Sequence, residues 1–395
     1  YICLVGVILM AWSVGLSNAQ KLLRLEETVE LRYTADRLTL DQVKEVEKGE
    51  TESENKLIKG VVAWKQTSKQ TFKNEELEKS IEGDLLEVYG QLTLLLPQDK
   101  LIGQNLYKGD SEGAIITKGV AEQLWGSTDV VGKTFKHEER EYVVRGILQD
   151  ATKSIVVQVN EKSKDAQFSA LRLVMMEQGN IEEHLNTLRS KYSLPEGIVN
   201  NLSLKSIGLS NLVLLPGGLL GTYVLLKLYY FIYKTHRYWV SALLLALIAI
   251  CTTWMMSELV PFTFQLPAYM IPNQWSDIEF WSNLVNKIGE NKAMLDALPS
   301  YLPDYWYQTL QTNLIISFTL TMVGIMLFIK KMKLNTGKEL FVRVLLAIVI
   351  SFVSILVMYG IGEEVGVIRA FWVVIPMYLV IDFLITKWKT LFEIQ

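Results

Sequence analysis

The sequence predicts an α-helical integral membrane protein with about six transmembrane helices and an inserted α+β extracytoplasmic domain. Half of the 395 residues are hydrophobic, which is high for a soluble protein. These residues gather at the start of the chain and again between residues 212 and 385. Between the two regions lies a polar block of roughly 190 residues with the composition of a globular domain.

Six apolar segments approach the length of about 20 residues that a membrane span needs. They are residues 1–16, 212–233, 239–256, 314–329, 340–359 and 371–385. The first segment has two interpretations. It is a retained helix, or it is a leader peptide cleaved after Ser17–Asn18–Ala19, a sequence typical of signal-peptidase sites. Both interpretations export the polar block.

The charges of the links orient the spans. Lysine and arginine follow the second, fourth and sixth segments, which places these ends in the cytoplasm. Residues 258–307 and the pair Glu363–Glu364 are acidic and are expected outside. The predicted organisation is a first span at 1–19, an exported domain at 20–210, a transmembrane hairpin at 211–258, an outer segment at 259–308 and three spans at 309–395, in a cell membrane.

The exported domain mixes helices and strands, which indicates the α+β class. Helices are expected at 38–47, 83–89 and 181–192, and strands at 57–64, 67–72, 92–96, 154–159 and 170–176. Both cysteines, Cys3 and Cys251, lie in apolar segments, so the exported domain uses no disulfides.

Residues 115–150 form the most informative stretch. An apolar strand leads into a helix with Val120, Leu124 and Trp125 at helical spacing, and Gly126 ends that helix. Strands at 133–136 and 141–148 then flank a polar tip. Five residues separate Gly126 from Gly132–Lys133, where a phosphate-binding loop needs four, so this stretch is a turn leading into a strand.

This stretch resembles the extracytoplasmic core domain of MacB-type and FtsX-like ABC transporter permeases. The matching residues are Gly119–Val120–Ala121, Leu124–Trp125–Gly126, Val131–Gly132–Lys133 and Val144–Arg145–Gly146–Ile147–Leu148–Gln149–Asp150. The resemblance implies a domain that binds a substrate or a partner outside the membrane and transmits motion to the spans. It also implies a separate ATPase subunit, because the chain has no nucleotide-binding domain.

The membrane part departs from that family, whose permeases have four spans. The link after the second predicted span is too short for the cytoplasmic helix that docks on the ATPase. The basic link after the fourth span resembles the family's coupling segment in shortened form. The candidate coupling residues are Lys330, Lys331, Lys333, Gly337 and Lys338.

Two ionisable residues inside predicted spans are further candidates, since burying charge in lipid is costly. Lys227 lies in the second span and Asp382 near the end of the sixth. They form an intramembrane charge pair, or else Lys227 extends to the membrane surface.

The outer segment is rich in Pro and Trp, residues that are common at membrane–water interfaces. They are Pro261, Pro267, Pro272, Trp275, Trp281, Pro299, Pro303 and Trp306. Residues 276–298 are expected to form one or two interfacial helices on the outer leaflet. They border a site for lipid or a hydrophobic peptide, or they serve as a structural cap.

No catalytic, cofactor or metal site is expected. The histidines His137, His184 and His236 are far apart in sequence, and we expect them to be exposed. The sequence therefore predicts a non-enzymatic membrane subunit of an ABC-type export or mechanotransmission complex. The alternatives are an envelope sensor or scaffold with the same exported domain and, less favoured, a membrane-embedded enzyme. Expected partners are membrane lipid, an ATPase, an extracytoplasmic protein or peptide, and a second copy of the chain; nucleic acid is not expected.

Overall fold

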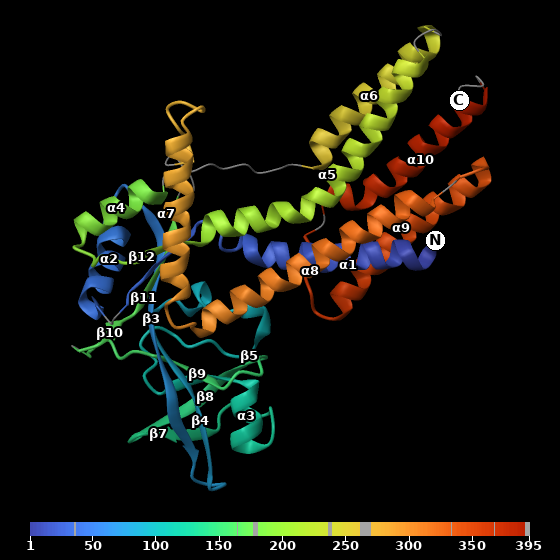
Figure 1. The fold of residues 1–395 in the computed structure, drawn as a ribbon. Helices are drawn as coiled ribbons and strands as arrows, with labels where there is room; N and C mark the ends of the chain where they lie inside the picture. Colours follow the sequence, from blue (N-terminus) through green and yellow to red (C-terminus); the bar gives the residue numbers. More distant parts are fainter. Residues whose placement is uncertain are drawn as a thin grey trace. The chain divides into compact units, whose positions relative to one another are not determined.

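The computed structural model describes residues 1–34, 37–163, 165–176, 181–235, 239–260, 270–332, 334–366 and 368–391. The chain divides into two compact units (Figure 1). The membrane unit comprises Tyr1–Leu25, Leu204–Phe264 and Gln308–Gln395. The sheet unit comprises Glu26–Ser203 and Gln265–Tyr307, so it contains most of the polar block and most of the outer segment.

Six helices in the described ranges are long and apolar enough to cross a membrane, as the sequence predicts. They are α1 (Ile2–Leu23), α5 (Leu202–Thr235), α6 (Trp239–Leu259), α8 (Leu302–Lys331), α9 (Gly337–Gly360) and α10 (Arg369–Leu391). Even α6, with 21 residues, is about 30 Å long and matches the hydrocarbon core of a bilayer. The protein is therefore a multi-pass membrane protein with an inserted α+β unit.

Trp12 of α1 organises part of the membrane unit. Its ring packs edge-on against Phe371 of α10, with 5.6 Å between ring centroids, and its indole Nε1 donates to the carbonyl of Val213 in α5 at 2.9 Å. A Cβ atom at Gly217 would approach this ring to 3.3 Å, so a small residue at that position admits the indole. The first helix is thereby joined to α5 and α10.

A mixed ten-stranded sheet forms the core of the sheet unit. Its strand order is β12-β1-β11-β3-β4-β9-β6-β8-β5, and β7 pairs with β3 and β8. The bounds are β1 (Thr28–Arg32), β3 (Ile58–Asn74), β4 (Lys79–Gly90), β5 (Leu101–Gly103), β6 (Gly113–Thr117), β7 (Thr134–His137), β8 (Arg140–Leu148), β9 (Ser154–Gln158), β11 (Ala170–Met175) and β12 (Ile198–Asn201). The β4–β9 and β6–β8 pairs are parallel, and the remaining pairs are antiparallel. A separate pair joins β2 (Leu38–Thr39) to β10 (Gln167–Phe168).

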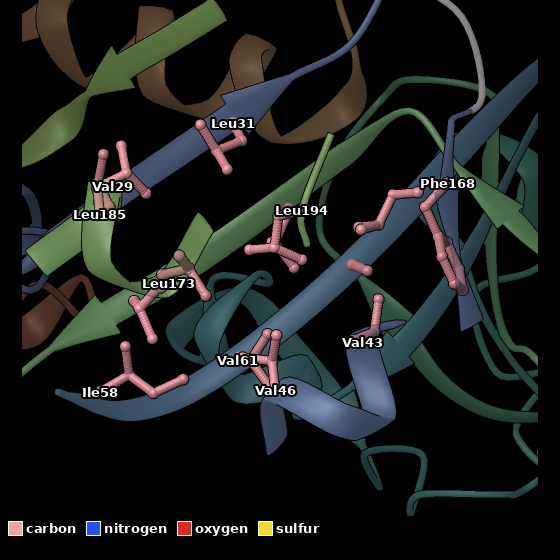
Figure 2. Packing of buried hydrophobic residues seen from close by; sticks show 14 of the residues in the cluster. Val29, Leu31, Val43, Val46, Ile58, Val61, Phe168, Leu173, Leu185 and Leu194 are labelled. Atoms are coloured by element: carbon pink, nitrogen blue, oxygen red, sulfur yellow. The ribbon is translucent and has the colours of Figure 1, made fainter. Parts of the chain in front are cut away.

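Three helices complete the sheet unit within the polar block: α2 (Leu40–Glu52), α3 (Lys118–Trp125) and α4 (Ile181–Lys191). Their apolar faces are buried. Val43 and Val46 of α2 and Leu185 of α4 join one cluster with strand residues such as Val29 and Leu173, shown in Figure 2. Helices at these positions are as predicted. The amphipathic spacing of the sequence identified them because each has a single buried face.

Residues 83–89 are strand, so the helix predicted there is wrong. They belong to β4, a central strand buried on both faces. Leu86 and Val88 enter one apolar cluster, and Ile81 and Leu85 enter another. A strand buried on both faces loses the alternation of polar and apolar residues that distinguishes it from a helix.

The strand predicted at 92–96 is also wrong. Gly90 adopts a φ of +112° at the end of β4, and the chain then turns through the 3₁₀ helix η1 (Leu92–Leu94). The leucines of η1 pack into the apolar cluster around Trp64, and none of the described strands pairs with them. Burial in this cluster, and not a strand, explains why the stretch is apolar. A second turn, η2 (Gln98–Lys100), leads into β5.

The outer segment contains one helix in its described part, α7 (Ile278–Asp296). Asp277 caps it by accepting a hydrogen bond from the backbone N–H of Phe280 at 3.0 Å. None of its residues is buried, and Asn291 Nδ2 donates to the carbonyl of Val199 in β12 at 3.0 Å. Its location at a membrane surface stays a prediction. Pro261 and Pro267 lie outside the described residues.

Candidate functional site

The stretch 115–150 has the predicted order of strand, helix, turn and two strands. It runs through β6, α3, β7 and β8. Gly126 ends α3 with a φ of +73°, and Gly132 forms the following turn with a φ of +86°. Gly132 N–H donates to the carbonyl of Val144 at 2.8 Å, and β7 starts at Thr134. The turn therefore leads into a strand, as the sequence indicated, and not into a nucleotide-binding helix.

A buried ionic cluster lies at the other edge of the sheet, and the sequence analysis missed it. It comprises Glu30, Arg32, Arg172, Asn200 and Asp304, and we call it the anchor cluster. Strand register creates it, because Glu30 of β1 lies opposite Arg172 of β11 on one side and Asn200 of β12 on the other. Charged residues inside the apolar strands Thr28–Arg32 and Ala170–Met175 were the available signal.

Glu30 is the centre of the anchor cluster. Arg172 donates to its Oε1 from Nη2 at 2.6 Å and from Nε at 2.8 Å. Arg32 Nε and Asn200 Nδ2 donate to Oε2 at 3.1 and 3.0 Å. Only 1% of Glu30 is exposed. Both carboxylate oxygens are therefore satisfied without water.

The electrostatics of the anchor cluster favour the ionised forms. Burial alone would raise the pKa of Glu30, but Arg32 and Arg172, with the hydrogen bonds from Arg172 and Asn200, lower that pKa to about 2. Burial would lower the pKa of Arg32, but Glu30 and Asp304 raise it. The indole of Trp64 lies beneath both guanidinium groups, at 4.9 Å from Arg32 and 5.4 Å from Arg172.

The first turn of α8 is bound to the sheet at two points within the sheet unit. Asp304 forms an ion pair with Arg32. Trp306 Nε1 donates to Asp150 Oδ2 at 2.7 Å, and Asp150 is the last residue of the motif at 115–150. Tyr301, Leu302 and Trp306 are also buried in the same apolar cluster as Trp64. The root of this span is therefore part of the sheet unit's core.

Lys227 and Asp382 are brought together within the membrane unit. Lys227 Nζ of α5 forms an ion pair with Asp382 Oδ1 of α10, and the Asp382 side chain is 10% exposed against 29% for Lys227. Thr386 and the buried Tyr378 lie one turn to either side of Asp382 on α10. Any role for this pair in the protein's activity stays a proposal.

The structure places the basic link at the exposed ends of two helices. Lys330 and Lys331 end α8, Gly337 begins α9, and Lys338 lies in the first turn of α9. All four are exposed. Thr336 caps α9 by accepting from Glu339 N at 3.3 Å. Lys333 lies outside the described residues.

His137 is buried, so the exposure predicted for it is wrong. Its Nδ1 lies 3.0 Å from the carbonyl of Thr71, and its ring packs on Phe72, because it ends β7 beside β3. His184 is half-buried on α4, and His236 lies outside the described residues. Among the residues that the structure describes, no group of histidine, cysteine or acidic side chains could hold a metal ion.

Comparisons with known proteins return structures but no sequence families. No family model matches the chain, and no curated protein matches it. Solved structures do match. The periplasmic region of MacB from Actinobacillus actinomycetemcomitans is 13% identical, with a TM-score of 0.36, and the match covers 45% of this chain and 89% of that chain. The extracellular domain of YknZ, a noncanonic ABC-type transporter from Gram-positive bacteria, is 21% identical, with a TM-score of 0.33, and the match covers 44% and 98%.

Proposed function

We propose that this protein is the membrane subunit of an ABC-type export or mechanotransmission complex whose ATPase is a separate chain. The sheet unit lies outside the cell membrane and binds a substrate or a protein partner there. The motif at 115–150, folded in the order that the family resemblance implies, supports the assignment of this unit.

The observation that carries the proposal is the anchor cluster. Glu30 lies in β1, which follows α1 directly, and Asn200 lies at the end of β12, just before α5. Asp304 belongs to the first turn of α8. One buried carboxylate and its partners thus fix the chain beside three membrane spans. Separating the members of a buried, fully paired cluster is costly. A force on the segment next to one of these spans is therefore transmitted to the segments next to the other two.

On the opposite side of the membrane, the exposed lysines at the end of α8 and the start of α9 supply the contact with the ATPase. Lys330, Lys331 and Lys338 are exposed and cationic. The link between the two helices is short, so a displacement of the link would be passed to both helices. Membrane lipid surrounds the spans, and a second copy of the chain completes the complex.

The second candidate is an envelope sensor or scaffold that carries the same exported unit without transport. The short links between α5 and α6 and between α8 and α9 favour it, because neither has room for a separate coupling helix.

Affinity purification of the full chain from native membranes distinguishes the two candidates. We expect a tag on the cytoplasmic side to recover an ABC ATPase, and charge reversal at Lys330, Lys331 and Lys338 to reduce that recovery. Charge reversal at Lys133 and Lys162, which are exposed lysines of the sheet unit, is the matched control. Recovery of membrane proteins without any ATPase would support the sensor or scaffold instead.

A further inference from the structure

The sheet unit contains a cavity that the proposed function does not use. Its volume is about 450 Å³, within the range of small-molecule sites. One wall comes from β3 and β4, another from residues 152–154, which lead into β9, and the third from residues 300–305, which lead into α8. The third wall belongs to the outer segment.

The floor of the cavity is fixed by hydrogen bonds. Gln66 donates from Nε2 to Asp84 Oδ2 at 3.2 Å and accepts at Oε1 from the backbone N–H of Leu302 at 2.8 Å. Asp84 N–H donates to the carbonyl of Lys153 at 2.8 Å. One polar atom of the lining is left over: the hydroxyl oxygen of Thr152 is buried and has no hydrogen-bond partner in the structure. A buried hydroxyl without a partner is costly, so a bound polar group at this wall would satisfy it.

A β-bulge shapes the wall at β3. The β3–β4 register shifts between Thr67 and Gln70, and Lys69 adopts a φ of +59°, which is rare for a residue with a side chain. Bulges of this kind redirect side chains and are common beside functional sites. Here the bulge places Lys69 in the lining of the cavity.

The charges of the lining are balanced. Lys69, Lys153 and Glu82 are exposed and form no ion pair with any residue that the structure describes, and Asp84 adds a second carboxylate. A purely anionic ligand would be repelled by Glu82 and Asp84, and a purely cationic ligand would be repelled by the two lysines. An apolar ligand would leave Lys69, Lys153, Glu82 and the Thr152 hydroxyl without partners. The lining therefore complements a molecule that carries both signs.

We propose that this cavity binds a small zwitterionic ligand of the peptide class, with one free ammonium and one free carboxylate group. The carboxylate lies toward Lys69 and Lys153, the ammonium lies toward Glu82 and Asp84, and amide groups between them reach Thr152. An extended tripeptide is about 10 Å long and fits this volume. This proposed binding depends only on the lining of the cavity and not on the proposed function.

The position of the cavity gives the ligand access to α8. Tyr301, Leu302 and Tyr305 line it, and Leu302 N–H is held by Gln66 on the facing wall. A ligand between these walls would contact the start of α8, which Asp304 and Trp306 attach to the sheet. This consequence, unlike the binding, rests on the proposed function.

Calorimetric titration of the purified full chain in lipid nanodiscs tests the proposal, with tri-alanine as the probe. We expect saturable binding of tri-alanine. N-acetyl-tri-alanine, which lacks the ammonium group, and tri-alanine amide, which lacks the carboxylate, should each bind about two- to fivefold more weakly, the effect expected of one exposed ion pair.

Variants assign each end of the peptide. The double substitution Lys69→Met, Lys153→Met should weaken tri-alanine by the same factor, yet leave the already weak tri-alanine amide unchanged. Glu82→Gln should act in the same way on tri-alanine and leave N-acetyl-tri-alanine unchanged. Lys133→Met, Lys162→Met, outside the cavity, is the matched control and should bind like the wild type. If a cavity variant fails to fold, the capped peptides still test both contacts on the unaltered protein.

Absence of saturable tri-alanine binding would overturn the proposal, as would equal binding of all three peptides. Binding of phosphoethanolamine without tri-alanine would also overturn it, because the anionic group would then not be a carboxylate. These outcomes are independent of the recovery of an ATPase, so failure here and failure of the proposed function can be told apart.

Discussion

The indole of Trp306 donates a hydrogen bond to the carboxylate of Asp150, joining the root of α8 to the final residue of the motif at 115–150. Asp150 Oδ1 also accepts from Thr152 N–H at 2.8 Å. The most recognisable part of the sequence thus contacts the part of the outer segment that leads into a span.

Trp306→Phe should destabilise the sheet unit by about 1–3 kcal/mol, because Asp150 loses a donor at a buried position. Chemical denaturation of the full chain, followed by a probe in the sheet unit, measures the effect. Trp275→Phe is the control, since Trp275 is 68% exposed, and it should change the free energy of unfolding little. Equal stability of the two variants would show that the indole hydrogen bond contributes nothing.

Glu30→Gln should be more damaging, by about 3–5 kcal/mol, because it leaves two buried guanidinium groups without their shared carboxylate. The double substitution Glu30→Met, Arg172→Met removes both charges and should recover part of the loss. The same denaturation experiment measures both variants. The loss of stability in the double variant should be smaller than the summed losses of Glu30→Met and Arg172→Met alone. A larger loss would contradict this account of the anchor cluster.

Acid should weaken the sheet unit through Glu30. Its folded-state pKa of about 2 lies below its ordinary value of 4.5, so the folded state favours the ionised form. The resulting stability is fully present above pH 4.5 and declines as the pH falls toward 2, by about 3 kcal/mol in total. Unfolding free energies measured across this range in the wild type and in Glu30→Gln should converge at low pH. Parallel curves would exclude Glu30 as the source.

The effect of reversing one charge of the intramembrane pair Lys227–Asp382 should be cancelled by reversing the other. Lys227→Asp or Asp382→Lys alone should lower the yield of monodisperse protein, because each leaves like charges together within a span. The double reversal should restore the yield. Size-exclusion chromatography of detergent-solubilised protein gives the readout, and reversal of the helical pair Lys118–Glu122 in α3, whose side chains are 44% and 53% exposed, serves as a comparison. Without rescue, the contact has no energetic importance.

Gly146 should tolerate a side chain less well than Gly132. A Cβ atom at Gly146 would lie 2.7 Å from the carbonyl oxygen of Gln104, a backbone atom that cannot turn away. Gly132 has open space around it and only the strain of its positive φ, about 1 kcal/mol for alanine. Alanine at each position, compared by thermal unfolding, should give the larger loss at Gly146. The reverse order would exclude close packing as the cause.

The sequence predicted the spans and the motif well because each depends on local signals. Apolar length identifies a membrane helix, and Gly126 identifies the end of α3. It failed where neighbours from distant parts of the chain decide the structure. Leu86 is strand because β3 and β9 flank it, and His137 is buried because β3 lies beside β7.

The anchor cluster was out of reach for the same reason. Glu30 and Arg172 look like isolated charges in two apolar strands, and only the register of β1 against β11 places them opposite each other. Asp304 joins them from a third region, and no local pattern connects it to Arg32. Lys227 and Asp382 could be singled out because charge inside a span is conspicuous by itself.

The late position of Tyr301, Leu302 and Trp306 in the chain has a consequence for biosynthesis. These residues complete the apolar cluster around Trp64, and Asp304 completes the pairing of Arg32. A chain emerging from its N-terminus has already made α5 and α6 before it supplies them. The sheet unit therefore cannot complete its apolar core until the chain beyond two membrane helices has been synthesised.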